Sequence, residues 1–135
     1  KNFEIGKAEV ISEGNDVAIL VYGFLLGEAV KAKEILEAQG KSVRLINLRT
    51  VKPIDEEVIL KAAKECKMIL TLEDHFLTGG LYSIIAEIFL RNQITAKVVP
   101  VAMDNKWFKP VIGQDLLEYE GFTGKQIAEK ILKNL

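Results

Sequence analysis

The stretch VAILVYGFLLGEAVKAKEILEAQGKSVRLINL, residues 17–48, decides the fold. It begins with Val17–Tyr22, a continuous apolar run rich in β-branched residues, which predicts a strand buried on both faces of a parallel sheet. From Leu25 to Leu36 apolar residues recur at helical spacing, and Gly40 follows as a stop signal. Val43–Leu48 then supplies the next strand. A strand, a helix and a strand in this order predict a right-handed crossover within an α/β sheet.

The remainder of the chain repeats this alternation. Further strands are expected at Met68–Leu72 and Ala96–Val101, and further helices at Glu56–Cys66 after an Asp55 cap, at Gly80–Leu90, as a short turn at Asp115–Tyr119, and from a Thr123 cap to the C-terminus. Pro100 should place the last strand near a sheet edge, since proline cannot donate to a ladder. The pattern predicts one domain over residues 1–135, a three-layer α/β/α sandwich.

The first strand, Ala8–Ser12, breaks the pattern. The link that follows it, Glu13–Asp16, is rich in turn residues and too short for a crossover. This strand must therefore run antiparallel to the others. Local reasoning alone pairs it with Val17–Tyr22 as a hairpin.

Composition excludes several classes of protein. The 135 residues carry 18 Lys and Arg against 19 Asp and Glu, a net charge of −1 spread along the chain, so we expect neither nucleic acid nor a membrane surface as partner. Cys66 is the only cysteine, which excludes an internal disulfide and fits a cytoplasmic location. The chain starts at Lys1 rather than Met, and we expect it to be a piece of a longer protein.

The strongest candidate site is the run Glu73-Asp74-His75-Phe76-Leu77-Thr78-Gly79-Gly80, between a buried strand and a helix. Ligands of open α/β sheets bind at such carboxyl ends. Two carboxylates beside the only histidine could position a proton-transfer group, and Gly79-Gly80 would let an anion approach the N–H groups of the helix. The alternative is structural: Asp74 or Thr78 caps the helix, His75 is a loop residue, and the glycines allow tight packing.

A second candidate follows the strand Val17–Tyr22. Gly23 and Phe24 open a helix there, but the run has only two glycines, and a tight turn explains Gly23 as well as a nucleotide site does. Cys66 lies near Lys64 and Lys67, which would lower the pKa of an exposed thiol, whereas a half-buried structural thiol is the alternative. No metal-ligand cluster or P-loop is present in the sequence.

The helix Gly80–Leu90 is apolar over most of its circumference. We expect it to be buried on more than one side, by a second domain or subunit, through the candidate interface residues Ile84, Ile85, Ile88 and Phe89. The alternative is a helix central to its own layer. Trp107 and Phe108 add two large aromatic side chains in a loop, which is typical of a contact surface. The alternative is that they tuck under the edge of the sheet.

Three stretches together resemble a known family. They are residues 48–57 (LRTVKPIDEE), Thr71–His75 with Gly79-Gly80-Leu81, and Ile5–Ala8 with Gly14 and residues 16–19. Their order is similar to the C-terminal domain of transketolase, most of all the C-terminal subunit of the split-gene prokaryotic form. The loop 106–112, with its Trp-Phe pair, departs from the family's usual pattern.

The resemblance implies a five-stranded mixed sheet of strand order 1-3-2-4-5 with the first strand antiparallel. It therefore moves Ala8–Ser12 from the hairpin to a place beside Val43–Leu48. It also implies that the loops at Gly23 and at Glu73–His75 face one crevice.

The resemblance also bears on function. Members of the family transfer a two-carbon ketol unit between sugar phosphates, using thiamine diphosphate and Mg²⁺. The family's cofactor motif, G-D-G followed by Asn-Asn, does not occur in this sequence, and the glutamate that activates the cofactor belongs to another domain. We therefore expect this chain to hold no catalytic, metal or cofactor-binding residue of its own.

The role that remains is structural. The resemblance implies contact with the N-terminal and pyrimidine-binding domains of the same enzyme, in a homodimer or higher assembly. The same domain of deoxyxylulose-phosphate synthase or of a 2-oxo-acid dehydrogenase β subunit is an alternative. So is a free-standing module that binds an anion or nucleotide. A hydrolase that uses His75 has no nucleophile near it in the sequence.

Overall fold

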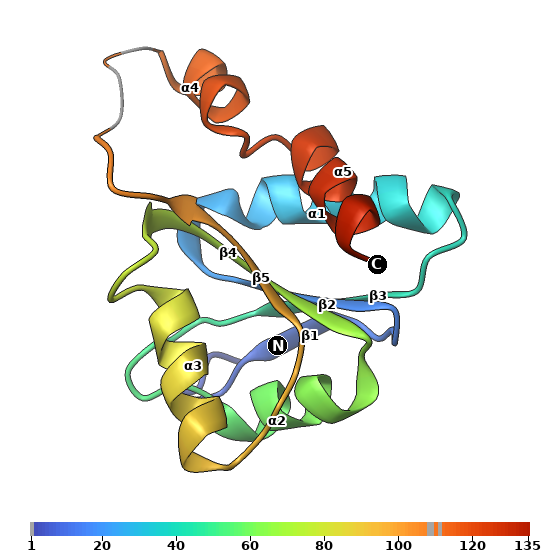
Figure 1. Cartoon of the computed structure of the whole chain (residues 1–135), viewed down its shortest axis with the longest axis vertical. Coiled ribbons are helices and arrows are strands. Elements are labelled where there is room, and N and C mark those ends of the chain that lie inside the picture. The colour runs from blue at the N-terminus through green and yellow to red at the C-terminus, as the bar shows by residue number, and fades with distance from the viewer. Residues whose placement is uncertain (1, 108–109, 111) are drawn as a thin grey trace.

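The computed structural model of the chain describes residues 2–107, 110 and 112–135. Five strands form one sheet that lies between two layers of helices (Figure 1). The strands are β1 (Glu9–Ser12), β2 (Val17–Val21), β3 (Val43–Asn47), β4 (Met68–Phe76) and β5 (Val98–Met103). The helices are the 3₁₀ turn η1 (Gly23–Leu25), α1 (Leu26–Ala38), α2 (Glu56–Glu65), α3 (Leu81–Arg91), α4 (Gly113–Glu120) and α5 (Gly124–Asn134).

The strand order is β1-β3-β2-β4-β5, as the family resemblance implied. β2 is the central strand and pairs in parallel with β3 on one side and with β4 on the other. All five of its residues, Val17–Val21, are buried, because helices cover both faces of the sheet. The prediction of a strand buried on both faces is confirmed.

β1 lies antiparallel beside β3, so the hairpin expected from local reasoning is wrong and the placement from the resemblance is confirmed. Both edges of β2 are occupied by parallel partners, which leaves β1 no edge of that strand to join. The link between β1 and β2 packs against the start of β3 instead. The carboxylate of Asp16 accepts the N–H of Ser42 at 2.8 Å, and the hydroxyl of Ser12 donates to the carbonyl of Val43 at 2.9 Å.

The helices cover the sheet in pairs (Figure 1). Alternate residues of a strand point to opposite faces, so Ile19 belongs to the core under α1 and α5, while Leu20 belongs to the core under α2 and α3. Leu117 of α4 also joins the α1 and α5 side. Within the described residues, no helix has the length and apolar character needed to cross a bilayer.

The predicted element boundaries are wrong at two strands. The prediction ended the third buried strand at Leu72, whereas β4 continues to Phe76 because its backbone still pairs with β5, opposite Met103. β5 likewise starts and ends two residues later than predicted, although Pro100 does lie in an edge strand, as expected. As a result, Glu73–His75 belongs to a strand rather than to a loop.

Two predicted helix caps are confirmed. Thr123 forms a capping box with Gln126 at the start of α5. Asp55 accepts the N–H of Val58 at the start of α2, and its second carboxylate oxygen accepts the N–H of Ala8 at 2.9 Å. The Asp55 carboxylate therefore also fixes the segment that leads into β1.

Gly14 permits the close approach between the β1–β2 link and β3. A Cβ on Gly14 would lie 2.4 Å from the carbonyl carbon of Val43 and 2.5 Å from its nitrogen, and both are backbone atoms. We predict that Gly14→Ala lowers the free energy of unfolding by about 2 kcal/mol or more, through strain that forces the link away from β3. Urea unfolding of the two proteins measures the difference.

The matched control is Gly27→Ala in α1, where an added Cβ meets nothing within 4 Å. Alanine favours helix over glycine, so this change should be neutral or stabilise the domain by up to about 1 kcal/mol. Equal effects of the two substitutions would contradict the proposed packing of Gly14.

Candidate functional site

The carboxyl end of β2 lies beside the middle of β4, at the centre of the sheet. Val21 pairs with Leu72, so the next residues, Tyr22 and Glu73, also come together. The hydroxyl of Tyr22 donates a hydrogen bond to the carboxylate of Glu73 at 3.2 Å. In open α/β folds this is the place where ligands bind. The candidate site is therefore built around this pair.

Glu73 is fully buried, yet its carboxylate has three donors. Its Oε2 accepts the N–H of Leu81 at 2.7 Å and the Tyr22 hydroxyl, while its Oε1 accepts the N–H of Tyr82 at 3.2 Å. Leu81 and Tyr82 are the first residues of α3, where unpaired N–H groups and the helix dipole favour a negative charge. The helix end that the sequence offered to an anion is thus occupied by the protein's own carboxylate.

The Gly79-Gly80 turn is shaped to admit that carboxylate. A Cβ on Gly80 would lie 2.2 Å from Oε2 of Glu73 and 2.4 Å from the carbonyl oxygen of Phe76. The N–H of Gly79 donates to the hydroxyl of Ser83 at 2.8 Å. Neither Asp74 nor Thr78 caps the helix, so that part of the structural alternative is wrong, while its expectation of tight packing at the glycines is right for Gly80.

Tyr22 is a hydrogen-bond partner of Glu73 that the sequence interpretation missed. Burial, followed by the negative charge of Glu73, raises the pKa of the Tyr22 phenol to about 12. The phenol therefore stays protonated at neutral pH and acts as a donor to Glu73 rather than as a base. Its place at the end of an apolar strand gave it the appearance of a core residue. Tyr22 could have been found from strand pairing: if β2 and β4 pair in parallel with Val21 opposite Leu72, Tyr22 and Glu73 come together.

The remaining crevice residues lie in different environments. Asp74 is half-buried, and the exposed ring of His75 packs edge-to-face on Phe76 with centroids 5.8 Å apart. Among the described residues, His75 has no hydrogen bond or ion pair with Asp74 or Glu73. Gly23 begins η1 beside β4, and Phe24 points its ring into solvent. The structure gathers these residues at one edge of the sheet.

A cavity of about 330 Å³ lies beside this site, between the ends of β4 and β5. Trp107 forms one wall and packs edge-to-face on Phe76, with ring centroids 5.4 Å apart. Of the candidate run, Phe76, Leu77 and Thr78 line it, whereas Glu73–His75 and Gly79-Gly80 do not. Phe108, the other predicted aromatic contact, lies outside the described residues. The cavity is lined by Phe76, Leu77, Thr78, Met103, Asp104, Asn105, Lys106 and Trp107.

The apolar face of α3 is largely used inside the domain. Ile85, Ile88 and Phe89 are buried in the core that α3 shares with the sheet and α2, and Ile84 is half-buried against the same core. The expectation that a second domain is needed to bury these side chains is wrong for the first three. The alternative of a helix central to its own layer does not hold either, because α3 packs beside α2 alone among the described helices and Leu90 on it is 82% exposed.

Cys66 has the character of a structural thiol. Burial raises the pKa of its thiol, and its sulfur donates to the carbonyl of Gly14 at 3.3 Å. The nearby lysines therefore do not activate it, and the half-buried alternative holds.

The contribution of the Glu73 hydrogen bonds to stability can be tested by substitution. Glu73→Gln replaces one accepting oxygen by an amide that faces the N–H groups of Leu81 and Tyr82, so it should lower the free energy of unfolding by about 2 kcal/mol. His75→Ala, two residues along the same strand, removes an exposed ring and should change it by less than about 0.5 kcal/mol. Denaturant unfolding of both variants checks this. Similar losses of unfolding free energy would argue against a stabilising role of the buried Glu73 carboxylate.

The raised pKa of Tyr22 predicts a specific pH dependence. The unfolded phenol ionises near its usual pKa of 10.0 and the folded one near 12, so the stability it contributes is fully present below pH 10 and is lost as the pH rises toward 12. The difference in unfolding free energy between the parent and Tyr22→Phe should therefore shrink over that interval. A difference that stays constant with pH would show that the phenol is not perturbed.

The chain matches the family model described as transketolase, C-terminal domain, over residues 6–127. It is 34% identical over 133 residues to a Methanocaldococcus jannaschii protein assigned as a transketolase C-terminal section, covering 98% of this chain and 41% of that protein. It is 33% identical over 135 residues to 1-deoxy-D-xylulose-5-phosphate synthase of Dictyoglomus thermophilum, covering all of this chain and 22% of that enzyme. The chain thus spans well under half the length of these relatives.

Solved structures agree on the fold. A split-gene transketolase, determined as an inactive tetramer of β subunits, superimposes with a TM-score of 0.90 at 32% identity. The match covers 98% of this chain and 43% of that one. With the family model matching most of the sequence, the chain belongs to the transketolase C-terminal domain family.

Proposed function

We propose that this chain is the C-terminal domain of a transketolase and that it serves the enzyme as a structural and interface domain. The match over residues 6–127 carries the proposal. The intact enzyme would transfer a two-carbon ketol unit between sugar phosphates. The chain's share of that work is to fold independently and to present a surface to the N-terminal and pyrimidine-binding domains.

The proposal assigns thiamine diphosphate and Mg²⁺ to those other domains. The donor set at the candidate site does not fit a diphosphate, because the N–H groups of Leu81 and Tyr82 already bind the Glu73 carboxylate. A second anion there would meet that negative charge. In the part of the chain that the structure describes, no three His, Cys, Asp or Glu side chains gather as metal ligands. No step of the reaction is therefore assigned to residues of this domain.

The same geometry argues against a free-standing anion or nucleotide module. Such a module would need free N–H donors at the N-terminal end of α3, and those of Leu81 and Tyr82 are bound to the Glu73 carboxylate. The similarity to a split-gene transketolase that forms a tetramer supports a homodimer or higher assembly for the enzyme. We also assign it to the cytoplasm, on the free thiol of Cys66.

A synthase of 1-deoxy-D-xylulose 5-phosphate is the second candidate, since such an enzyme is 33% identical to the chain over its whole length. Both enzymes would use this domain in the same way. The substrate residues of the preceding domains separate them, and the product of the intact enzyme identifies which one is present.

The proposal predicts that catalysis needs more than this chain. With thiamine diphosphate, Mg²⁺, a ketose phosphate donor and an aldose phosphate acceptor, residues 1–135 alone should give no turnover above buffer. The complete natural enzyme, assayed by chromatography of the sugar phosphates, should exchange the two-carbon unit. Turnover by the chain alone that disappears in His75→Ala would overturn the proposal.

A further inference from the structure

We infer that the edge of the sheet where β2 to β5 end is the face on which the preceding domain of the intact enzyme docks. This inference rests on the proposed function, since it needs an enzyme in which other domains precede this one. It goes further by naming the surface. The face, called the carboxyl edge below, is defined by five exposed apolar side chains: Phe3, Ile5, Phe24, Val51 and Trp107.

The topology gathers these side chains at one edge. β2, β3, β4 and β5 are parallel, so the segments that follow them emerge at the same edge. Phe24 follows β2, Val51 follows β3, and Trp107 follows β5 and packs on the last residue of β4. β1 is antiparallel, so the segment before it also lies at this edge. Segments that are far apart in the sequence therefore share one face.

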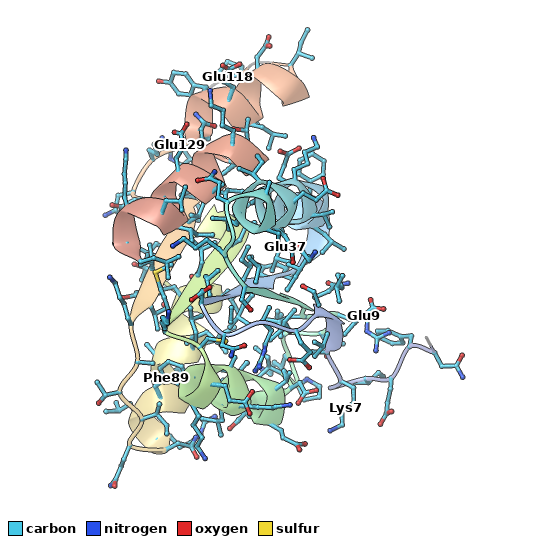
Figure 2. All side chains as sticks on the ribbon, turned by 90° about the vertical axis from the view of Figure 1, so that its right-hand side faces the viewer. Lys7, Glu9, Glu37, Phe89, Glu118 and Glu129 are labelled. Carbon is cyan, nitrogen blue, oxygen red and sulfur yellow. The ribbon has the colours of Figure 1, made fainter. Side chains whose placement is uncertain are left out.

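The N-terminal segment is fixed against this face rather than free in solution. The guanidinium of Arg49 donates to the carbonyl of Asn2 at 3.2 Å and lies over the ring of Phe3, 5.6 Å from its centroid. The N–H of Gly6 donates to the hydroxyl of Thr50 at 2.9 Å. Figure 2 shows this segment reaching out beyond Lys7 and Glu9 at the β1 side of the sheet.

The exposure of these side chains has no explanation inside the domain. Phe24 is 69% exposed and Trp107 is 83% exposed, although each borders a well-packed core. Single exposed apolar residues are ordinary, but aromatic and aliphatic side chains gathered on one face mark an interaction surface. Large aromatic residues are also those enriched at the centres of protein interfaces.

The occupant follows from the place where the chain enters the domain. In an enzyme that carries this domain at its C-terminal end, the preceding polypeptide leads into the segment before β1. Asn2 is held against Arg49, so that polypeptide begins beside the carboxyl edge. This chain covers 41% of the length of one relative and 22% of another. These relatives therefore have further sequence that can supply the partner surface. We expect the partner to be apolar where it meets Phe24 and Trp107.

Hydrogen exchange tests the inference on the chain and on the complete natural enzyme. Backbone amides in residues 2–6, 22–25, 49–52 and 104–107 should exchange at least about tenfold more slowly in the complete enzyme, because docking closes local openings there. Amides of residues 39–42 and 65–67, which lie at the opposite ends of β3 and β4, should exchange at similar rates in both. Equal exchange at the carboxyl edge would overturn the inference.

Substitution supplies a matched pair. Phe24→Asp and Leu90→Asp each place a charge at a side chain that is exposed in the isolated domain, 69% and 82%, so neither should alter the unfolding of residues 1–135. In the complete enzyme, Phe24→Asp should remove most of the protection at the carboxyl edge, whereas Leu90→Asp on α3 should leave it intact. The reverse result would place the interface on α3 and overturn the inference.

The outcomes separate this inference from the proposed function. A natural polypeptide with no preceding domain, or one without ketol transfer, refutes the proposed function and the inference with it. A complete enzyme that transfers the ketol unit, while its carboxyl edge exchanges as fast as in residues 1–135, refutes the inference alone.

Discussion

The buried carboxylate of Glu73 is the constraint on which the centre of this domain depends. A charge with no exposure to water is costly unless several donors surround it. Its donors come from two different elements, the hydroxyl of Tyr22 after β2 and the first N–H groups of α3. The positions of β2, β4 and α3 are therefore fixed relative to one another. Gly80 makes this possible, since any side chain there would displace the carboxylate.

This constraint also explains why the usual ligand site of an open α/β sheet serves a structural role in this chain. The helix end that binds anions in related architectures holds an internal anion. In the proposal made above, the domain's role lies instead in exposed side chains near Glu73, among them Phe24 and Trp107. On this proposal the domain would contribute a rigid surface to an enzyme whose chemistry is carried by a cofactor held elsewhere.

Sequence patterns predicted the elements well where a local signal was strong. The run Val17–Tyr22, the Asp55 and Thr123 caps and the edge position of Pro100 each follow from short-range chemistry, and each is confirmed. Pairing between distant strands was not accessible in this way. The antiparallel direction of β1 followed from the short link after it, but its place beside β3 needed the family resemblance, because a short link between two strands looks the same whether or not a third strand separates them.

The candidate site shows the same division. Its location at Glu73 was predicted from the change from strand to helix, but its character was not, because nothing local says that the carboxylate turns inward and that Tyr22 meets it. The apolar surface of α3 misled for a related reason, since side chains buried by their own domain and side chains buried by a partner have the same composition.

The most direct measurement of the central claim is an experimental structure of the complete enzyme. The account predicts that Phe24 and Trp107, which are 69% and 83% exposed in this domain, become buried against the preceding domain, with Glu73 still bound to α3. A structure in which both rings remain in solvent would contradict it. So would one in which a phosphate or cofactor displaces Glu73 from the end of α3.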